Sequence, residues 1–114
     1  MNLEISPKDY ERELNWHDAN LYCELLTIDN KNDWRLPTIE ELYDMYTGNI
    51  DLGFKFPHHQ LSCFYWAGME PYGNMTNSVD VIRGYRIMKN VKELLKVRPV
   101  RYIFNHLDHY YKNG

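Results

Sequence analysis

The chain has 114 residues, of which 44% are hydrophobic, 15% are aromatic and 25% are charged, with a net charge of −3. This length fits one domain with a hydrophobic core, and the composition excludes a disordered chain. The acidic balance argues against nucleic-acid binding, and no apolar stretch is long enough to span a membrane. We expect one domain over residues 1–104 and a C-terminal tail over residues 105–114.

The N-terminal part predicts a short strand at about residues 3–5, followed by a helix. Asn15 is a typical N-cap, and Asp18 three residues later completes a weak capping box. Side chains that recur at three- and four-residue spacing predict a helix over residues 16–26, with one inward face. That inward face consists of Trp16, Ala19, Tyr22, Cys23 and Leu26. A polar stretch at residues 29–32 predicts a turn.

A second helix is predicted over residues 39–46. Thr38 is its N-cap, because its hydroxyl can accept from the backbone N–H of Glu41 while the Glu41 carboxylate reaches back to Thr38. Pro37 restrains the residue before it to an extended conformation, which fixes how the chain enters the helix. Gly48 is the expected left-handed residue at the C-terminal end.

Asp33 and Arg35 flank Trp34 just before this helix. A buried carboxylate and a buried guanidinium persist only when they are paired. We therefore interpret Asp33 and Arg35 as a structural ion pair beneath a loop layer.

Three strands are predicted in the C-terminal half, at residues 63–67, 79–88 and 96–104. Pro99 cannot donate a ladder hydrogen bond, so the third strand is expected at a sheet edge or with a bulge. The stretches 49–61 and 69–77 have the composition of loops.

Charge is distributed unevenly along the chain. Residues 1–70 have five basic and thirteen acidic side chains, whereas residues 83–101 have seven basic side chains and one acidic side chain. The basic segment could attract an anionic partner. Alternatively, it could be neutralised internally by the acidic half. Arg98 and Arg101 are three positions apart, so they should face opposite sides of a strand unless it bulges.

Cys23 and Cys63 are expected to be reduced thiols, with a disulfide between them as the alternative. Both occupy inward positions, where cysteine behaves as a small hydrophobe, so no catalytic residue is assigned. The pairs His58–His59 and His106–His109 do not supply three converging ligands, and no metal or other cofactor is expected. The segment Glu70-Pro71-Tyr72 lacks the amide ligand of a calcium-dependent sugar site.

Four blocks occur in a characteristic order: residues 15–23 (NWHDANLYC), 33–42 (DWRLPTIEEL), 64–67 (FYWA) and 97–101 (VRPVR). Together they resemble the bacterial and phage domains called DUF1566 or Lcl C-terminal-like, of the C-type-lectin-like superfamily. This resemblance implies an α+β fold in which two helices pack on a twisted antiparallel sheet, with a long loop region and adjacent termini. Pro99 stands where the family commonly has a cysteine, which excludes a bridge from Cys23 to that strand.

The resemblance also places recognition in the region between the aromatic strand and the closing strand, here about residues 69–96. The leading hypothesis is a non-catalytic recognition module for a macromolecule, with a protein as the expected partner. Its binding residues are expected to be Tyr72, Asn74, Arg83, Tyr85 and Arg86. Its structural residues are expected to be Trp16, Tyr22, Asp33, Trp34, Arg35, Pro37, Thr38, Glu41 and Trp66.

Because no signal sequence is recognised, a cytoplasmic location is expected, and a phage or mobile-element protein that inhibits a host factor would fit. One alternative is a trimeric virion or surface adhesin tip, released by lysis, that binds an anionic polysaccharide. The other is a small enzyme or ligand-binding protein with a nucleotide-sized pocket lined by Trp66, Tyr85 and arginines. The sequence does not determine the oligomeric state.

Overall fold

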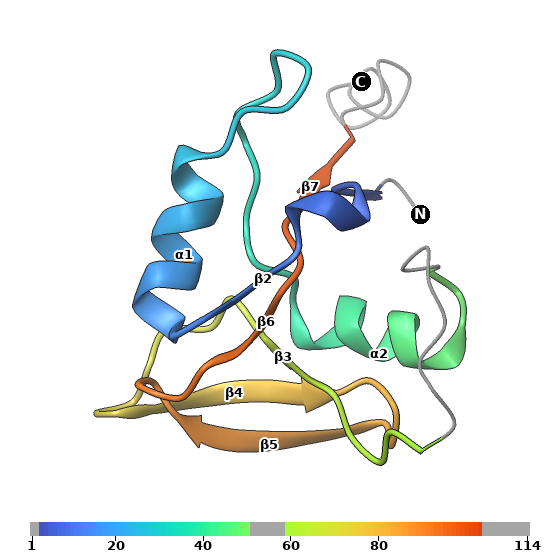
Figure 1. Ribbon diagram of the computed structural model, residues 1–114, viewed down its shortest axis with the longest axis vertical. Coiled ribbons are helices and arrows are strands. Elements are labelled where there is room, and N and C mark those ends of the chain that lie inside the picture. Colours follow the sequence, from blue (N-terminus) through green and yellow to red (C-terminus); the bar gives the residue numbers. More distant parts are fainter. Residues whose placement is uncertain (1–2, 51–58, 104–114) are drawn as a thin grey trace, which may run out of the picture.

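Two α-helices and seven strands form the part of the chain that the computed structural model describes, residues 3–50 and 59–103 (Figure 1). The helices are α1 (Trp16–Leu25) and α2 (Ile39–Thr47), and a 3₁₀ turn covers Lys8–Tyr10. A two-stranded ladder joins β1 (Leu3–Ile5) to β7 (Val100–Tyr102). A five-stranded sheet has the order β2 (Arg12–Leu14), β6 (Leu95–Val97), β3 (Phe64–Trp66), β4 (Met75–Asp80) and β5 (Tyr85–Asn90).

The domain is therefore α+β and compact, but its larger sheet is mixed rather than antiparallel. β6 pairs antiparallel with β2 and parallel with β3, because this late strand inserts between two strands made earlier. The antiparallel pairing of Leu3 with Tyr102 brings the first and last described strands together, as expected for adjacent chain ends. The tail at residues 105–114 and most of the predicted loop at 49–61 lie outside the described residues.

Both helices begin where the capping residues predicted. The Asn15 side chain accepts from the Asp18 backbone N–H, and Thr38 and Glu41 form a complete capping box. Gly48 ends α2 at φ +83°, a conformation that glycine adopts without strain. The predicted strand at 3–5 and the aromatic strand at 63–67 are also present, each within two residues of its predicted bounds.

The single strand predicted over residues 79–88 is wrong, as is part of the loop predicted at 69–77. The structure has two strands here, β4 and β5, joined by a turn. Asp80 explains the turn, because its Oδ1 accepts from the backbone N–H groups of Ile82 (2.9 Å) and Arg83 (3.1 Å). Gly84 completes the turn at φ +78°. This side-chain capping overrode the alternating pattern of the sequence.

The strand predicted over residues 96–104 is also divided. Arg98 and Pro99 separate β6 from β7, and the two strands belong to different sheets. The Pro99 carbonyl accepts from the Ser6 N–H (3.0 Å), which turns the chain from one sheet to the other. Sequence patterns also missed β2, whose three residues include two charged side chains.

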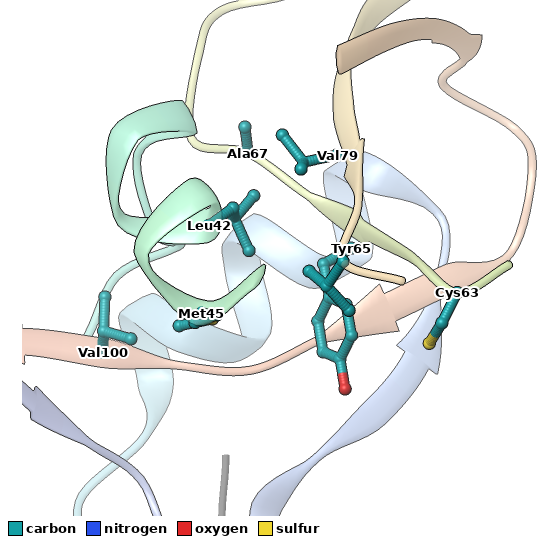
Figure 2. Close-up of a cluster of buried hydrophobic side chains, with 8 residues drawn as sticks. Leu42, Met45, Cys63, Tyr65, Ala67, Val79 and Val100 are labelled. Carbon is teal, nitrogen blue, oxygen red and sulfur yellow. The ribbon is translucent and has the colours of Figure 1, made fainter. Parts of the chain in front are cut away.

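Two clusters of buried side chains hold the layers together. One lies between α2 and the sheet, where Leu42 and Met45 pack near Tyr65 and Val79 (Figure 2). The other lies between α1 and the opposite sheet face. It consists of Trp16, Ala19, Cys23, Leu36, Trp66, Val91, Leu95 and Val97. Alternation along β3 therefore places Tyr65 in one cluster and Trp66 in the other.

Aromatic side chains with a polar atom fasten these layers. The indole N–H of Trp16 donates to the Ala67 carbonyl (3.0 Å), and that of Trp66 donates to the Leu14 carbonyl (2.8 Å). Tyr22 donates its hydroxyl hydrogen to the Tyr10 carbonyl (2.8 Å) in a similar way. A buried tryptophan needs such a partner, so these bonds fix how α1, β2 and β3 approach one another.

The interpretation of Asp33 and Arg35 as a pair is wrong. Arg35 forms a two-point ion pair with Glu41, at 2.8 and 2.9 Å, and Asp33 instead accepts from Arg101 at 2.6 Å. The backbone explains this choice of partner. The N–H and C=O groups of Arg35 pair with the Val100 backbone, and the Arg35 side chain extends toward Glu41 at the start of α2. Trp34 is buried as expected, and its indole N–H donates to the backbone carbonyl of residue 31.

Candidate recognition surface

The five residues predicted to bind a partner lie on the β4–β5 hairpin and the turn before it (Figure 1), but in two separate groups. Tyr72 and Asn74 lie where β4 begins, and Tyr72 is 89% exposed. Arg83, Tyr85 and Arg86 lie at the other end, around the turn into β5. Six residues of extended chain separate the groups by about 20 Å. The structure therefore brings together three of the five.

Tyr85 belongs to an aromatic and basic cluster that sequence reasoning did not assign to the site. Its ring meets the Phe64 ring edge to face, with centroids 6.5 Å apart. The Lys89 ammonium lies 4.3 Å from the centre of the Phe64 ring, a cation–π distance. Phe64 is opposite Asp80 on β4, and Asp80 is opposite Tyr85, so strand register creates the cluster. A sequence without known pairing could not have indicated it.

The opposite face of β5 presents Arg86 and Met88. Arg86 is opposite Val79 in the ladder, on the side of the sheet that α2 covers. Met88 is 42% exposed, although it lies next to this packed region. β5 therefore offers a basic and an apolar side chain on each face. We call the following residues the β5 surface: Phe64, Tyr85, Arg86, Met88, Lys89 and Lys92.

The turn that presents this surface is held by contacts with β3 and α2. Asp80 is fully buried, and its Oδ1 also accepts from the Cys63 backbone N–H (3.2 Å). The ring of Tyr46, on α2, lies directly against Gly84, where any added Cβ would overlap it. One carboxylate thus ties the turn to β3, and one aromatic ring ties it to α2.

Internal neutralisation applies to the C-terminal part of the basic segment. Three of its residues, in β6, in β7 and between them, reach carboxylates of the acidic N-terminal part. The pairs are Lys96–Glu13 (3.7 Å), Arg98–Glu11 (3.4 Å), Arg101–Glu4 (2.8 Å) and Arg101–Asp33 (2.6 Å). Arg98 is buried and Arg101 is only partly buried. The two do not face opposite sides of one strand, because Arg98 lies between β6 and β7 and only Arg101 belongs to a strand.

The hairpin part of the basic segment differs. Arg86, Lys89 and Lys92 form no ion pair within residues 3–50 and 59–103. Arg83 lies 3.9 Å from the buried Asp80 carboxylate, a long contact, and donates to the Leu61 carbonyl. The unneutralised positive charge of the segment is therefore concentrated at the hairpin.

Two hollows lined by described residues have volumes of about 220 and 180 Å³. The larger lies beside Arg35, Thr38 and Met69, and the smaller lies where β3 and β6 begin. Both are smaller than the ~300–1,000 Å³ typical of small-molecule sites. Trp66, expected to line a nucleotide-sized pocket in one alternative, is completely buried and cannot do so.

The cysteines are free thiols buried in different clusters. Burial, and to a smaller extent nearby carboxylates, raises the pKa of Cys23 to about 12 and that of Cys63 to about 11. Because the thiolate is the nucleophilic form, neither thiol has the character of a catalytic cysteine. Burial also raises the pKa of Tyr65, whose hydroxyl donates to Glu11 at 2.6 Å.

Within the described ranges, no group of three or more His, Cys, Asp or Glu side chains is arranged to hold a metal ion. His58, His106 and His109 lie outside those ranges. No helix in the described part is long and apolar enough to cross a membrane. No protein-family model matches the chain, and no curated protein matches it.

Proposed function

We propose that this chain is a C-type-lectin-like domain that works as a non-catalytic recognition module and binds an acidic protein surface through the β5 surface. The observation that carries the proposal is the unneutralised charge of Arg86, Lys89 and Lys92 beside exposed Tyr85 and Met88. Aromatic and arginine side chains are enriched in protein interfaces, and basic charge raises the association rate with an acidic partner.

The fold assignment rests on the four sequence blocks and on their places in the domain. The block at residues 33–42 includes the capping box that begins α2, and the block at 97–101 runs from the end of β6 into β7. Function does not follow from a fold, so the binding proposal rests on the β5 surface alone. A small module that only occupies its partner would suit inhibition of a host factor.

The proposal is tested by capturing partners from a lysate of the host cell on immobilised protein. The informative variant is Arg86→Ala/Lys89→Ala, which removes two charges from the β5 surface. Lys8→Ala/Lys31→Ala removes the same charge from exposed positions elsewhere and serves as the matched control. We expect one protein to be retained by the wild type and the control but not by the informative variant. Equal retention by all three would contradict the proposal.

An anionic polysaccharide is the second candidate, because unneutralised basic side chains also fit a polyanion. If this candidate is right, the protein should bind heparin, and that binding should weaken steeply as salt is added. The same two variants, applied to a heparin column in increasing salt, separate this candidate from a protein partner. A trimer in sedimentation experiments would further favour the adhesin hypothesis.

A further inference from the structure

We propose that the partner contributes an extended acidic segment that pairs with the free edge of β5 as an added strand; this rests on the proposed function. β5 is the last strand of the five-stranded sheet and pairs only with β4 among the described strands (Figure 1). A strand at a sheet edge presents unpaired N–H and C=O groups to any chain that can lie beside it. Such pairing is a common way of recognising extended peptides.

The hydrogen-bond register identifies the backbone groups that point outward. In an antiparallel ladder, the N–H and C=O groups of one residue both point toward the same neighbouring strand, and those of the next residue point the opposite way. The Asn77 carbonyl accepts from Ala67 N–H (3.1 Å), so Asn77 faces β3 and its ladder partner Met88 faces away from β4. The same alternation applies to Val79 and its partner Arg86. The N–H and C=O groups of Arg86 and Met88 therefore form the free edge.

The far end of this edge is closed by the protein itself. The backbone N–H of Asn90 donates to the Glu93 carboxylate (3.0 Å), and the Asn90 carbonyl accepts from Glu93 N–H (3.0 Å). The outward groups of Arg86 and Met88 have no comparable side-chain cap in the described part of the chain. Their two-residue spacing matches the spacing at which an added antiparallel strand forms paired hydrogen bonds.

Charge selects the occupant of this edge. Arg86 extends from one face of β5 and Lys89 from the other, and neither is paired with a carboxylate of the described residues. A second copy of the chain would place like charges beside each other, which is unfavourable across strands. An acidic strand would place carboxylates beside both residues and apolar side chains beside Tyr85 and Met88. The β5 surface therefore favours an acidic, extended segment over self-association.

The test uses a ten-residue synthetic peptide, capped at both ends, with two glutamates three positions apart, so that one lies beside Arg86 and the other beside Lys89 on the opposite face of the strand. Valines occupy the positions beside Tyr85 and Met88, and the remaining positions are threonine. Two further peptides have N-methyl groups on alternate residues, one on the odd positions and the other on the even positions. Only one of these patterns blocks the donors that face β5. We expect one methylated peptide to bind about tenfold more weakly and the other to bind like the parent. Equal binding of all three, or no binding at millimolar concentration, would overturn strand addition.

Amide hydrogen exchange locates the contact on the wild-type protein. The amides of Arg86 and Met88 should exchange at least about tenfold more slowly when the peptide is present. Met88→Pro removes one outward N–H and leaves the donors to β4, since proline is tolerated at an edge strand. It should lose the peptide, whereas Met88→Ala, which keeps the N–H and removes only the side-chain contact, should weaken binding only in part. Unchanged exchange at these amides would overturn the inference.

The outcomes separate this inference from the proposed function. If Arg86→Ala/Lys89→Ala loses the peptide while wild-type exchange stays unchanged, the acidic partner remains but strand addition is wrong. If that variant binds the peptide and the captured protein as well as wild type, the proposed function is wrong. Protection of Arg86 and Met88 that rises with protein concentration alone would mean that a second copy occupies the edge, which would also overturn the inference.

Discussion

The contact between Arg35 and Glu41 allows a stability effect to be calculated from its parts. Glu41 accepts two hydrogen bonds from Arg35 (2.8 and 2.9 Å) and one from Thr38 N–H (2.8 Å). The Arg35 side chain is 40% exposed, so solvent screening limits this pair to about 1–2 kcal/mol. The cap adds about 1 kcal/mol. Glu41→Ala should therefore lower the free energy of unfolding by about 2–3 kcal/mol, or Tm by about 8–12 °C.

Urea unfolding followed by circular dichroism measures this loss, with Glu40→Ala as the control. Glu40 lies in the same first turn of α2, is exposed and shares only the favourable interaction with the helix N-terminus, worth about 0.3–1 kcal/mol. Arg35→Ala should cost less than Glu41→Ala, because the capping box remains. If Glu41→Ala were no more destabilising than Glu40→Ala, the reasoning would be refuted.

Acid provides an independent check on the same carboxylate. Burial raises the pKa of Glu41, but hydrogen bonds from Arg35 and Thr38 together lower it below its ordinary value of 4.5. Because the folded pKa is below the unfolded pKa, the stabilisation is complete above pH 4.5 and is lost as the pH falls through the folded value. The stability difference between wild type and Glu41→Gln should accordingly be constant near pH 7 and should disappear in acid.

Three other effects can be measured on the same protein. Cys23 and Cys63 should react with a thiol reagent at pH 8 far more slowly in the folded protein than in urea, because both are buried and have raised pKa values; equal rates would contradict this burial. Gly84→Ala should lower the free energy of unfolding by about 1–2 kcal/mol, since φ at residue 84 is +78° and the Tyr46 ring occupies the place of the added Cβ. Adding Tyr46→Ala to this variant should recover only part of that loss, because the strained φ remains. Trp66→Phe should lower the free energy of unfolding by about 1–3 kcal/mol in chemical denaturation, because the partly buried Leu14 carbonyl of β2 loses its indole donor, and a change under 0.5 kcal/mol would count against this.

Local chemistry in the sequence was sufficient to place both helices. Asn15, Thr38 and Gly48 act on atoms within a few residues of themselves, so their effects can be read without the tertiary structure. Asp80 also acts locally, but the alternating residues around it concealed its turn. A carboxylate four residues before a glycine was the available signal.

Contacts between distant residues were not readable in this way. Arg35 has carboxylates at both Asp33 and Glu41 nearby in sequence, and only the packing of residue 35 against Val100 decides between them. The proposed β5 surface shows the same limit. Tyr85 was an evident candidate because it is an aromatic residue within the basic segment. Phe64 joins it only through the pairing of three strands.

The position of β6 has a consequence for how this chain acquires its structure. β6 is among the last strands to be synthesised, yet it is the second strand of the sheet and the neighbour of both β2 and β3. Until β6 is synthesised, β2 has no partner strand among those described and β3 is paired only with β4. Such long-range pairing delays folding, so a nascent chain on the ribosome should remain open until about residue 100 has emerged, and then close in a single step.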